Sequence, residues 1–174
     1  MRLRLRLLLL TIASVFRARL SITAENVLNL RVLPNDVDIR ALSSDRYLPL
    51  MDLGRINIAL RAGLLRALVR NRWIPLVRVA AIRFRHPLRI FEKFQLRSRA
   101  IYWDDEWIWT EHHFERNGRT IARGLTKVAF VGPGGIVPVA KIIAEAGERV
   151  VSPSLPSLVA EVQRVEEHIR EGQK

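Results

Sequence analysis

Acidic and hydroxyl side chains gather just ahead of and within the most apolar stretch of the sequence. These residues are Asp36, Asp38, Ser43, Ser44, Asp45, Tyr47 and Asp52. Backbone N–H groups at the start of a helix carry partial positive charge and suit a developing oxyanion. A carboxylate beside them can orient or deprotonate a water, or attack a carbonyl itself. The chemistry to look for is therefore attack on a carbonyl at a helix start.

The same residues also have purely structural interpretations. Asp38 can make a turn or capping bond in a loop, and Asp45 is more typical of a helix N-cap than of a catalyst. Tyr47 can line a pocket, although an aromatic residue at a helix start more often belongs to the core. Asp52 can equally form an (i, i+3) ion pair with Arg55.

One long helix is predicted to position these side chains, beginning near Arg46 or Tyr47 and ending near Leu68. Its apolar residues point in nearly every direction around a helical wheel, which predicts burial on most sides. Pro49 is expected in or near the first turn, because a proline deeper inside would break the hydrogen-bond ladder. Gly54 indicates close approach to another backbone.

The second half of the chain is predicted to form an antiparallel sheet. After a first strand over 26–33, long strands are expected over 73–85, 90–103, 106–116 and 119–131. Asn117-Gly118 is a strong hairpin signal, and hairpins join sequence neighbours into antiparallel pairs. Two helices follow, one over 137–146 and one carrying an apolar stripe of Leu158, Val162, Val165 and Ile169.

Composition narrows the choice of partner. The 174 residues fit one domain, and 29 Lys+Arg against 17 Asp+Glu give a net charge of +12. Such an excess suggests an anionic partner, namely nucleic acid, membrane headgroups or a phosphate-bearing small molecule; solubility alone is the alternative. With no cysteine, disulfides, zinc–cysteine sites and thiol catalysis are excluded.

Other site types find little support. His112 and His113 are strand neighbours that face opposite sides of a sheet, so no metal site is predicted. There is no serine-hydrolase elbow, P-loop or dinucleotide fingerprint. Tryptophans beside arginines are typical of base stacking, but aromatics at strand spacing are more often core or interface residues, so a nucleic-acid partner is not favoured.

Residues 1–24 are basic and apolar, with five arginines and no acid before Glu25. The uncharged run from Leu7 to Phe16 is shorter than the roughly 20 residues that a spanning helix needs. The segment suits a helix on an anionic membrane surface and equally a first helix packing on the domain or a partner subunit. A cleaved signal peptide is less favoured, so we expect a cytoplasmic protein, at most peripheral on the inner membrane surface.

Strand, loop, buried helix and antiparallel meander, in this order, resemble the hotdog fold. The segments VLPNDVDI, DRYLPLMDLGR and AIYWDDEWIWTEHHFERNGRTIARGL resemble the bacterial acyl-CoA thioesterase-like branch, which is similar to the 4-hydroxybenzoyl-CoA thioesterases. The resemblance covers roughly Val27 to Gly147. It implies an α+β hotdog fold over 25–147, an antiparallel sheet around a long central helix, with extra helices in segments 1–24 and 148–174.

This resemblance also implies an activity, hydrolysis of acyl-CoA to free acid and CoA without a metal or redox cofactor. The catalytic carboxylate would be the second acid of the D-x-D motif, Asp38, and the helix start would hold the oxyanion. The substrate would contact Ser43, Ser44, Tyr47 and Asp52, and its phosphates would meet arginines such as Arg55, Arg83 or Arg85. A homodimer or homotetramer with sheets paired edge to edge and active sites at the subunit interface is implied.

The chain departs from this family where the chemistry should be. The branch usually carries a His-Met-Asn-Asn run between the D-x-D and the Arg-Tyr-Leu. In this chain the corresponding segment is Ala41-Leu42-Ser43-Ser44-Asp45, which is one residue shorter. Asp36 or Asp45 can then substitute for Asp38 as the catalytic acid. The alternative hypothesis is a hotdog protein without catalysis that binds acyl chains or a protein partner, with a membrane surface as one place for that binding.

Overall fold

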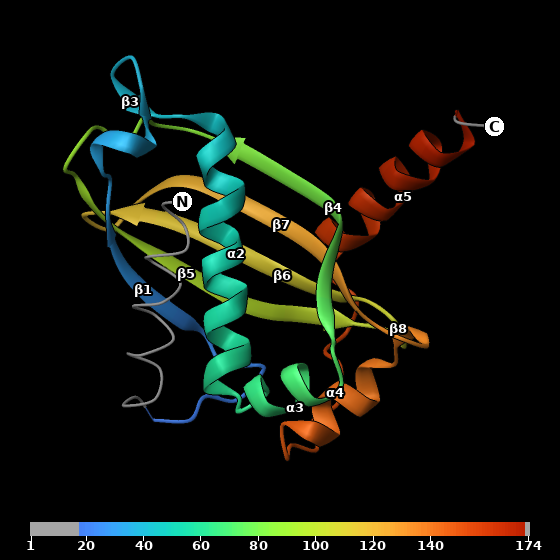
Figure 1. The fold of residues 1–174 in the computed structure, drawn as a ribbon. Helices are drawn as coiled ribbons and strands as arrows, with labels where there is room; N and C mark the ends of the chain where they lie inside the picture. Colours follow the sequence, from blue (N-terminus) through green and yellow to red (C-terminus); the bar gives the residue numbers. More distant parts are fainter. Residues whose placement is uncertain (1–17, 173–174) are drawn as a thin grey trace.

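A curled antiparallel sheet around one long helix forms the body of the molecule (Figure 1). The computed structural model describes residues 18–172. Across the sheet the strands follow in the order β1 (Asn26–Arg31), β5 (Lys93–Trp103), β6 (Ile108–Arg116), β7 (Arg119–Gly132) and β4 (Ile74–Phe84). The short β8 (Gly135–Val137) pairs with β7. This is the hotdog architecture that the sequence predicts.

The central strands β5, β6 and β7 form the predicted meander of sequence neighbours. Asn117 and Gly118 turn the chain between β6 and β7 with φ of 52° and 73°, as a two-residue hairpin loop of this composition requires. β1 and β4 are the two edge strands of the sheet, and both precede the meander in the sequence.

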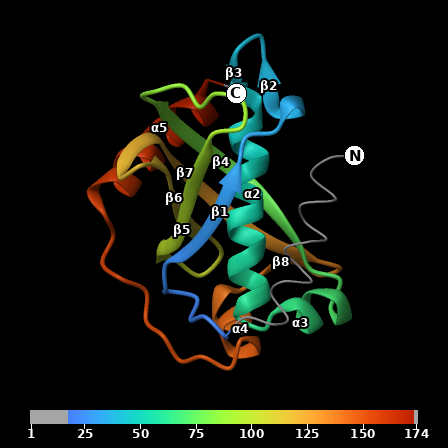
Figure 2. The same cartoon turned by 90° about the vertical axis from the view of Figure 1, so that its left-hand side faces the viewer.

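Helix α2 (Ser44–Arg61) lies across the concave face of the sheet, where it buries Leu50, Met51 and Leu53 (Figure 2). It begins two to three residues earlier than expected, so Pro49 lies in the second turn, next to the first. The helix also ends earlier, because Gly63 adopts φ of +82° and breaks it from the short α3 (Leu65–Arg70). The prediction of one continuous helix to Leu68 is therefore wrong.

The segment ahead of α2 is a small hairpin rather than the expected loop. A single 3-10 turn η1 (Pro34–Asp36) leads into β2 (Val37–Asp38), which pairs with β3 (Ala41–Leu42). Ile39 at the tip has φ of 56° and is 93% exposed. A positive φ is rare for a β-branched residue, and the tight two-residue turn accounts for it. The hairpin projects beyond the start of α2 (Figure 1).

The start of the described chain is tied to the body. The Ser21 hydroxyl donates to Glu148 (2.6 Å), the Ile22 N–H donates to the same carboxylate (3.0 Å), and the Ile22 side chain is buried. The expected membrane-surface helix falls mostly on residues 1–17, outside the described residues. Within residues 18–172, no helix has both the length and the apolar character needed to cross a membrane.

The last two helices are α4 (Val139–Glu145) and α5 (Ser157–Glu171). α5 lies on the outer face of the sheet, where Val159 packs against Trp109 and Leu125. The predicted apolar stripe was only partly right, because Val165 and Ile169 are more than half exposed.

Candidate active site

The N-cap side chain does not cap the backbone N–H groups at the start of α2. Ser43 occupies the N-cap position with an extended backbone, but its side chain makes no capping bond to the helix. Its hydroxyl is hydrogen-bonded to the Asp45 carboxylate instead. The first-turn N–H groups are therefore not capped by the side chain of Ser43, and together with the helix dipole they form a site for negative charge.

The two acids of the D-x-D motif have different environments. Asp36 is 9% exposed, its carboxylate accepts the Leu33 N–H (3.0 Å), and its carbonyl accepts the Ser43 N–H (3.0 Å). Asp36 thus holds the chain at the helix start. Asp38 lies on β2 opposite Ala41 and is exposed. Of the pair, Asp38 is the carboxylate accessible to a substrate.

Tyr47 is packed under the helix start rather than open to a ligand. It is 3% exposed, and its ring makes edge-on contacts with Phe84 and Phe114, each at 4.9 Å between centroids. Burial raises the pKa of Tyr47 to about 12, so its hydroxyl stays neutral. Because Phe84 belongs to β4, this contact ties the helix start to one end of the edge strand.

An apolar cavity of about 410 Å³ lies further along α2. It is bounded by α2, α3, the inner side of β4 and the sheet, with Ile56, Ala59, Leu64, Leu68, Val77 and Phe130 among its lining residues. Polar side chains in the lining are few: Asp52, Arg55 and Thr110. A mostly apolar cavity with a few polar groups is the usual form of a small-molecule site.

Asp52 and Arg55 form the ion pair that their spacing predicts. The Arg55 side chain is 13% exposed, and burial lowers the pKa of its guanidinium while the Asp52 carboxylate acts in the opposite direction. An arginine remains charged in this position. The pair thus places a fixed positive group, with its counter-ion, in the cavity wall. Asp38 and Asp45, by contrast, do not line this cavity within one chain.

A second depression of about 550 Å³ lies along β1 and the β6–β7 turn, at the opposite edge of the sheet from β4. Its lining is largely polar, including Asn29, Arg31, Lys93, Gln95, Glu115 and Arg116. It shares no residue with the helix start.

A buried polar cluster lies between α2 and the sheet. His112 is 0% exposed, with Ser98 Oγ 2.9 Å from its Nδ1 and Thr126 Oγ1 3.2 Å from its Nε2. Both ring nitrogens are thus satisfied by hydroxyls. Burial, followed by the charges of Arg55 and His113, lowers the pKa of His112 well below its usual value. His112 is therefore neutral in the folded protein.

This cluster makes stability depend on pH. The unfolded chain protonates His112 below about pH 6.5 and the folded chain does not, so the unfolding free energy should fall as pH drops below that value. The slope from this group approaches about 1.4 kcal/mol per pH unit. Urea unfolding between about pH 5 and pH 8 measures it. The variant His112→Gln should show a shallower slope, and equal slopes would contradict this account.

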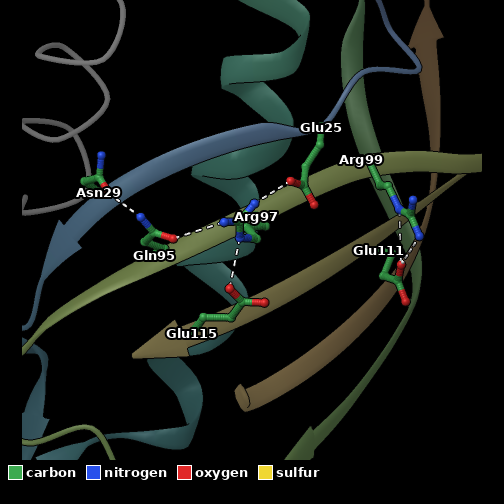
Figure 3. A network of polar contacts seen from close by, with 7 residues as sticks. All are labelled: Glu25, Asn29, Gln95, Arg97, Arg99, Glu111 and Glu115. Carbon is green, nitrogen blue, oxygen red and sulfur yellow. Dashed lines mark hydrogen bonds and ion pairs between the residues drawn. The ribbon is translucent and has the colours of Figure 1, made fainter. Parts of the chain in front are cut away.

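The outer face of the sheet carries charged networks. Figure 3 shows Arg97 between Glu25 (2.6 Å) and Glu115 (2.9 Å), with Arg99 beside Glu111. Burial alone would raise the pKa of Glu111, but hydrogen bonds and charge from Arg123 and His113 hold it below its usual value.

His113 faces the outer networks while His112 faces α2, as strand neighbours must. No group of three potential metal ligands occurs among residues 18–172.

Sequence reasoning missed two of these features. The cavity is assembled from several separate segments, and the only signal for it was small residues such as Ala59 and Ala100 at otherwise bulky apolar positions. The burial of His112 could have been predicted from the two-residue period of the strand, because Thr110, His112 and Phe114 occupy alternate positions on the buried face of β6.

Comparisons with known proteins agree with this architecture. Protein THEM6 from Xenopus laevis is 33% identical over 84 residues, covering 48% of this chain and 41% of that protein. Protein THEM6 from Danio rerio is 33% identical over 94 residues, covering 53% of this chain and 46% of that protein. The chain thus spans less than half the length of these relatives.

Solved structures show the same fold. A gentisyl-coenzyme A thioesterase superposes with a TM-score of 0.64 and 22% identity, over 68% of this chain and 99% of that one. A probable thioesterase from Bartonella henselae gives 0.60 and 21%, over 66% and 97%. The family model of the thioesterase-like superfamily matches residues 32–150. The chain therefore belongs to the thioesterase-like superfamily, as its D-x-D, helix and meander indicated.

Proposed function

We propose that this protein hydrolyses acyl-CoA thioesters at a site shared between two copies of the chain. The observation that supports this most directly is that the apolar cavity, the start of α2 and an unpaired strand edge all adjoin β4. The strand begins beside the apolar cavity, ends beside the start of α2, and exposes an unpaired edge within the described structure.

The edge of β4 is suited to pairing with a second copy. Eight of the 11 residues of the strand are exposed, including the large apolar residues Ile74, Leu76, Val77 and Phe84. A long apolar edge strand is a template for another strand. An antiparallel pair of identical strands has two-fold symmetry and closes as a dimer.

Such pairing completes a site that one chain leaves divided. In an antiparallel pair of β4 strands, the Phe84 end of one lies near the Ile74 end of the other. Phe84 contacts Tyr47 at the helix start, whereas Pro75 and Val77 line the cavity. The helix start and Asp38 of one subunit are therefore brought toward the cavity of the other.

Hydrolysis at this shared site needs few parts. The acyl chain occupies the cavity, and the thioester oxygen faces the first-turn N–H groups of α2 from the other subunit. Asp38 activates a water, which adds to the carbonyl carbon; the C–S bond breaks, and the CoA thiolate takes up a proton. The exposed Arg83 and Arg85 are candidates for the CoA phosphates, and Ser43, Ser44 and Asp52 for contacts near the thioester.

The test is thiol release from short, long and aromatic acyl-CoA thioesters, with the molecular mass measured in the same buffer by light scattering. We expect a dimer that hydrolyses at least one member well above the spontaneous rate. A dimer with no turnover on any member would contradict the proposal.

Acyl binding without catalysis is the second candidate function. The observation that favours it is the engagement of Asp45 by Ser43, in a loop that lacks the histidine and amides usual in the branch. In that case, the inactive dimer would still bind acyl-CoA in equilibrium dialysis.

A further inference from the structure

The short helix α3 presents an apolar and basic surface to solvent. Leu65 and Val69 are 42% and 71% exposed, and Leu65 also borders the apolar cavity. The arginines around them, Arg66, Arg70 and Arg72, are all exposed. We call these five residues the α3 surface. Aliphatic tips set among arginines are typical of surfaces that bind where apolar and anionic groups meet.

The α3 surface is rigidly supported. Gly63 redirects the chain after α2, and Leu64 and Ala67 on the inner side of α3 are each 3% exposed in the core. The exposure of Val69 therefore does not come from a frayed end. α3 and α4 lie together at the end of α2 that is remote from the β2–β3 hairpin (Figures 1 and 2).

Positive charge at this end is poorly balanced. Glu145 pairs with Arg70 (2.7 Å), and Glu148 accepts bonds from Ser21 and Ile22. Within residues 18–172, Arg66 and Arg72 form no ion pair. The guanidinium groups of these two residues are thus available to an external anion.

The chain enters the domain at the same place. The Arg61 guanidinium donates to the Ala18 carbonyl (3.2 and 3.1 Å), and a Cβ at Gly63 would lie 3.0 Å from the Arg19 guanidinium. The sequence that precedes Ala18 contains four arginines, no acid and the uncharged run from Leu7 to Phe16. Its junction with the domain therefore lies beside the α3 surface.

We propose that the α3 surface docks on an anionic phospholipid bilayer. Guanidinium groups pair with lipid phosphates in bidentate fashion, and Leu65 and Val69 enter the boundary between headgroups and acyl chains. This docking does not depend on thioester hydrolysis, so either proposal can fail without the other.

The test uses the full chain and sedimentation with vesicles of phosphatidylcholine, with or without phosphatidylserine. We expect binding only when phosphatidylserine is present. The triple variant Arg66→Gln, Val69→Ser, Arg72→Gln should lower the partition coefficient by about tenfold or more. A matched control removes the same groups elsewhere: Arg119→Gln, Val165→Ser, Arg170→Gln, all exposed. It should bind nearly as the wild type does.

Three outcomes would overturn the proposal. One is unchanged binding by the triple variant. Another is a loss that occurs only when Arg2, Arg4 and Arg6 are replaced by Gln, which would assign binding to the N-terminal segment alone. A third is a change in molecular mass of the triple variant, which would make the α3 surface a contact between copies of the chain.

Discussion

Asp38→Asn is expected to lower acyl-CoA turnover by about a hundredfold to ten-thousandfold, the usual contribution of a positioned acid or base. The amide keeps the size of the carboxylate but cannot accept the proton of the attacking water. Because Asp38 is exposed on a short hairpin, the fold and the dimer should be unaffected. Initial rates of thiol release at saturating substrate measure the effect.

Asp45→Asn is the matched control. Asp45 is also an exposed acid, one that accepts a hydrogen bond from Ser43 at the helix start, and its loss should leave turnover nearly unchanged. The reverse result, in which only Asp45→Asn loses turnover, would show that Asp45 is the catalytic acid in place of Asp38.

Mixed dimers test whether the site is shared. Ala59→Trp fills the cavity from α2 and should be inactive by itself. Refolding it together with Asp38→Asn at equal amounts makes about half of the dimers mixed, each with one intact site, so about a quarter of wild-type turnover should return. If Asp38 serves the cavity of its own chain, no activity returns.

Gly54→Ala is expected to destabilise the protein by about 2 kcal/mol. The added Cβ would overlap the Ser98 hydroxyl and lie 3.2 Å from the Ser98 Cβ, where α2 crosses β5. Alanine favours a helix over glycine by about 1 kcal/mol, so the steric cost must exceed that gain. Urea unfolding midpoints give the difference.

Gly134→Ala is the control, because nothing lies within 4 Å of its added Cβ. Ser98→Ala in the Gly54→Ala background removes the overlapping hydroxyl and should recover part of the loss. A double-mutant cycle with no coupling between positions 54 and 98 would contradict the close-approach account.

Strong local signals were enough to predict most of the fold. Asn117-Gly118 and the alternating strands around it led to the meander, and the apolar helix with Gly54 led to its position against the sheet. The break at Gly63 was missed because leucines at 60, 64, 65 and 68 continue the helical pattern across it. The β2–β3 hairpin was missed because strands of two residues are too short to show a period.

The candidate site was harder to predict than the fold. Spacing predicted the Asp52–Arg55 pair correctly, but nothing in the sequence separates Asp36, which holds the helix start, from the exposed Asp38. Their burial differs because Asp36 lies in the 3-10 turn, where it accepts the Leu33 N–H, whereas Asp38 lies in the hairpin opposite Ala41. The cavity depends on side chains that meet only after β4 and α2 have packed, so no single segment contains a signal for it.

The bond between Ser21 and Glu148 spans 127 positions of the chain. At a synthesis rate of about 5–20 residues per second, roughly 6 to 25 seconds pass after Ser21 is made before its partner exists. The pocket for Ile22, which includes Phe130 and Ile142, is finished equally late. The earliest-made residues of the described domain are thus among the last to be fixed in place.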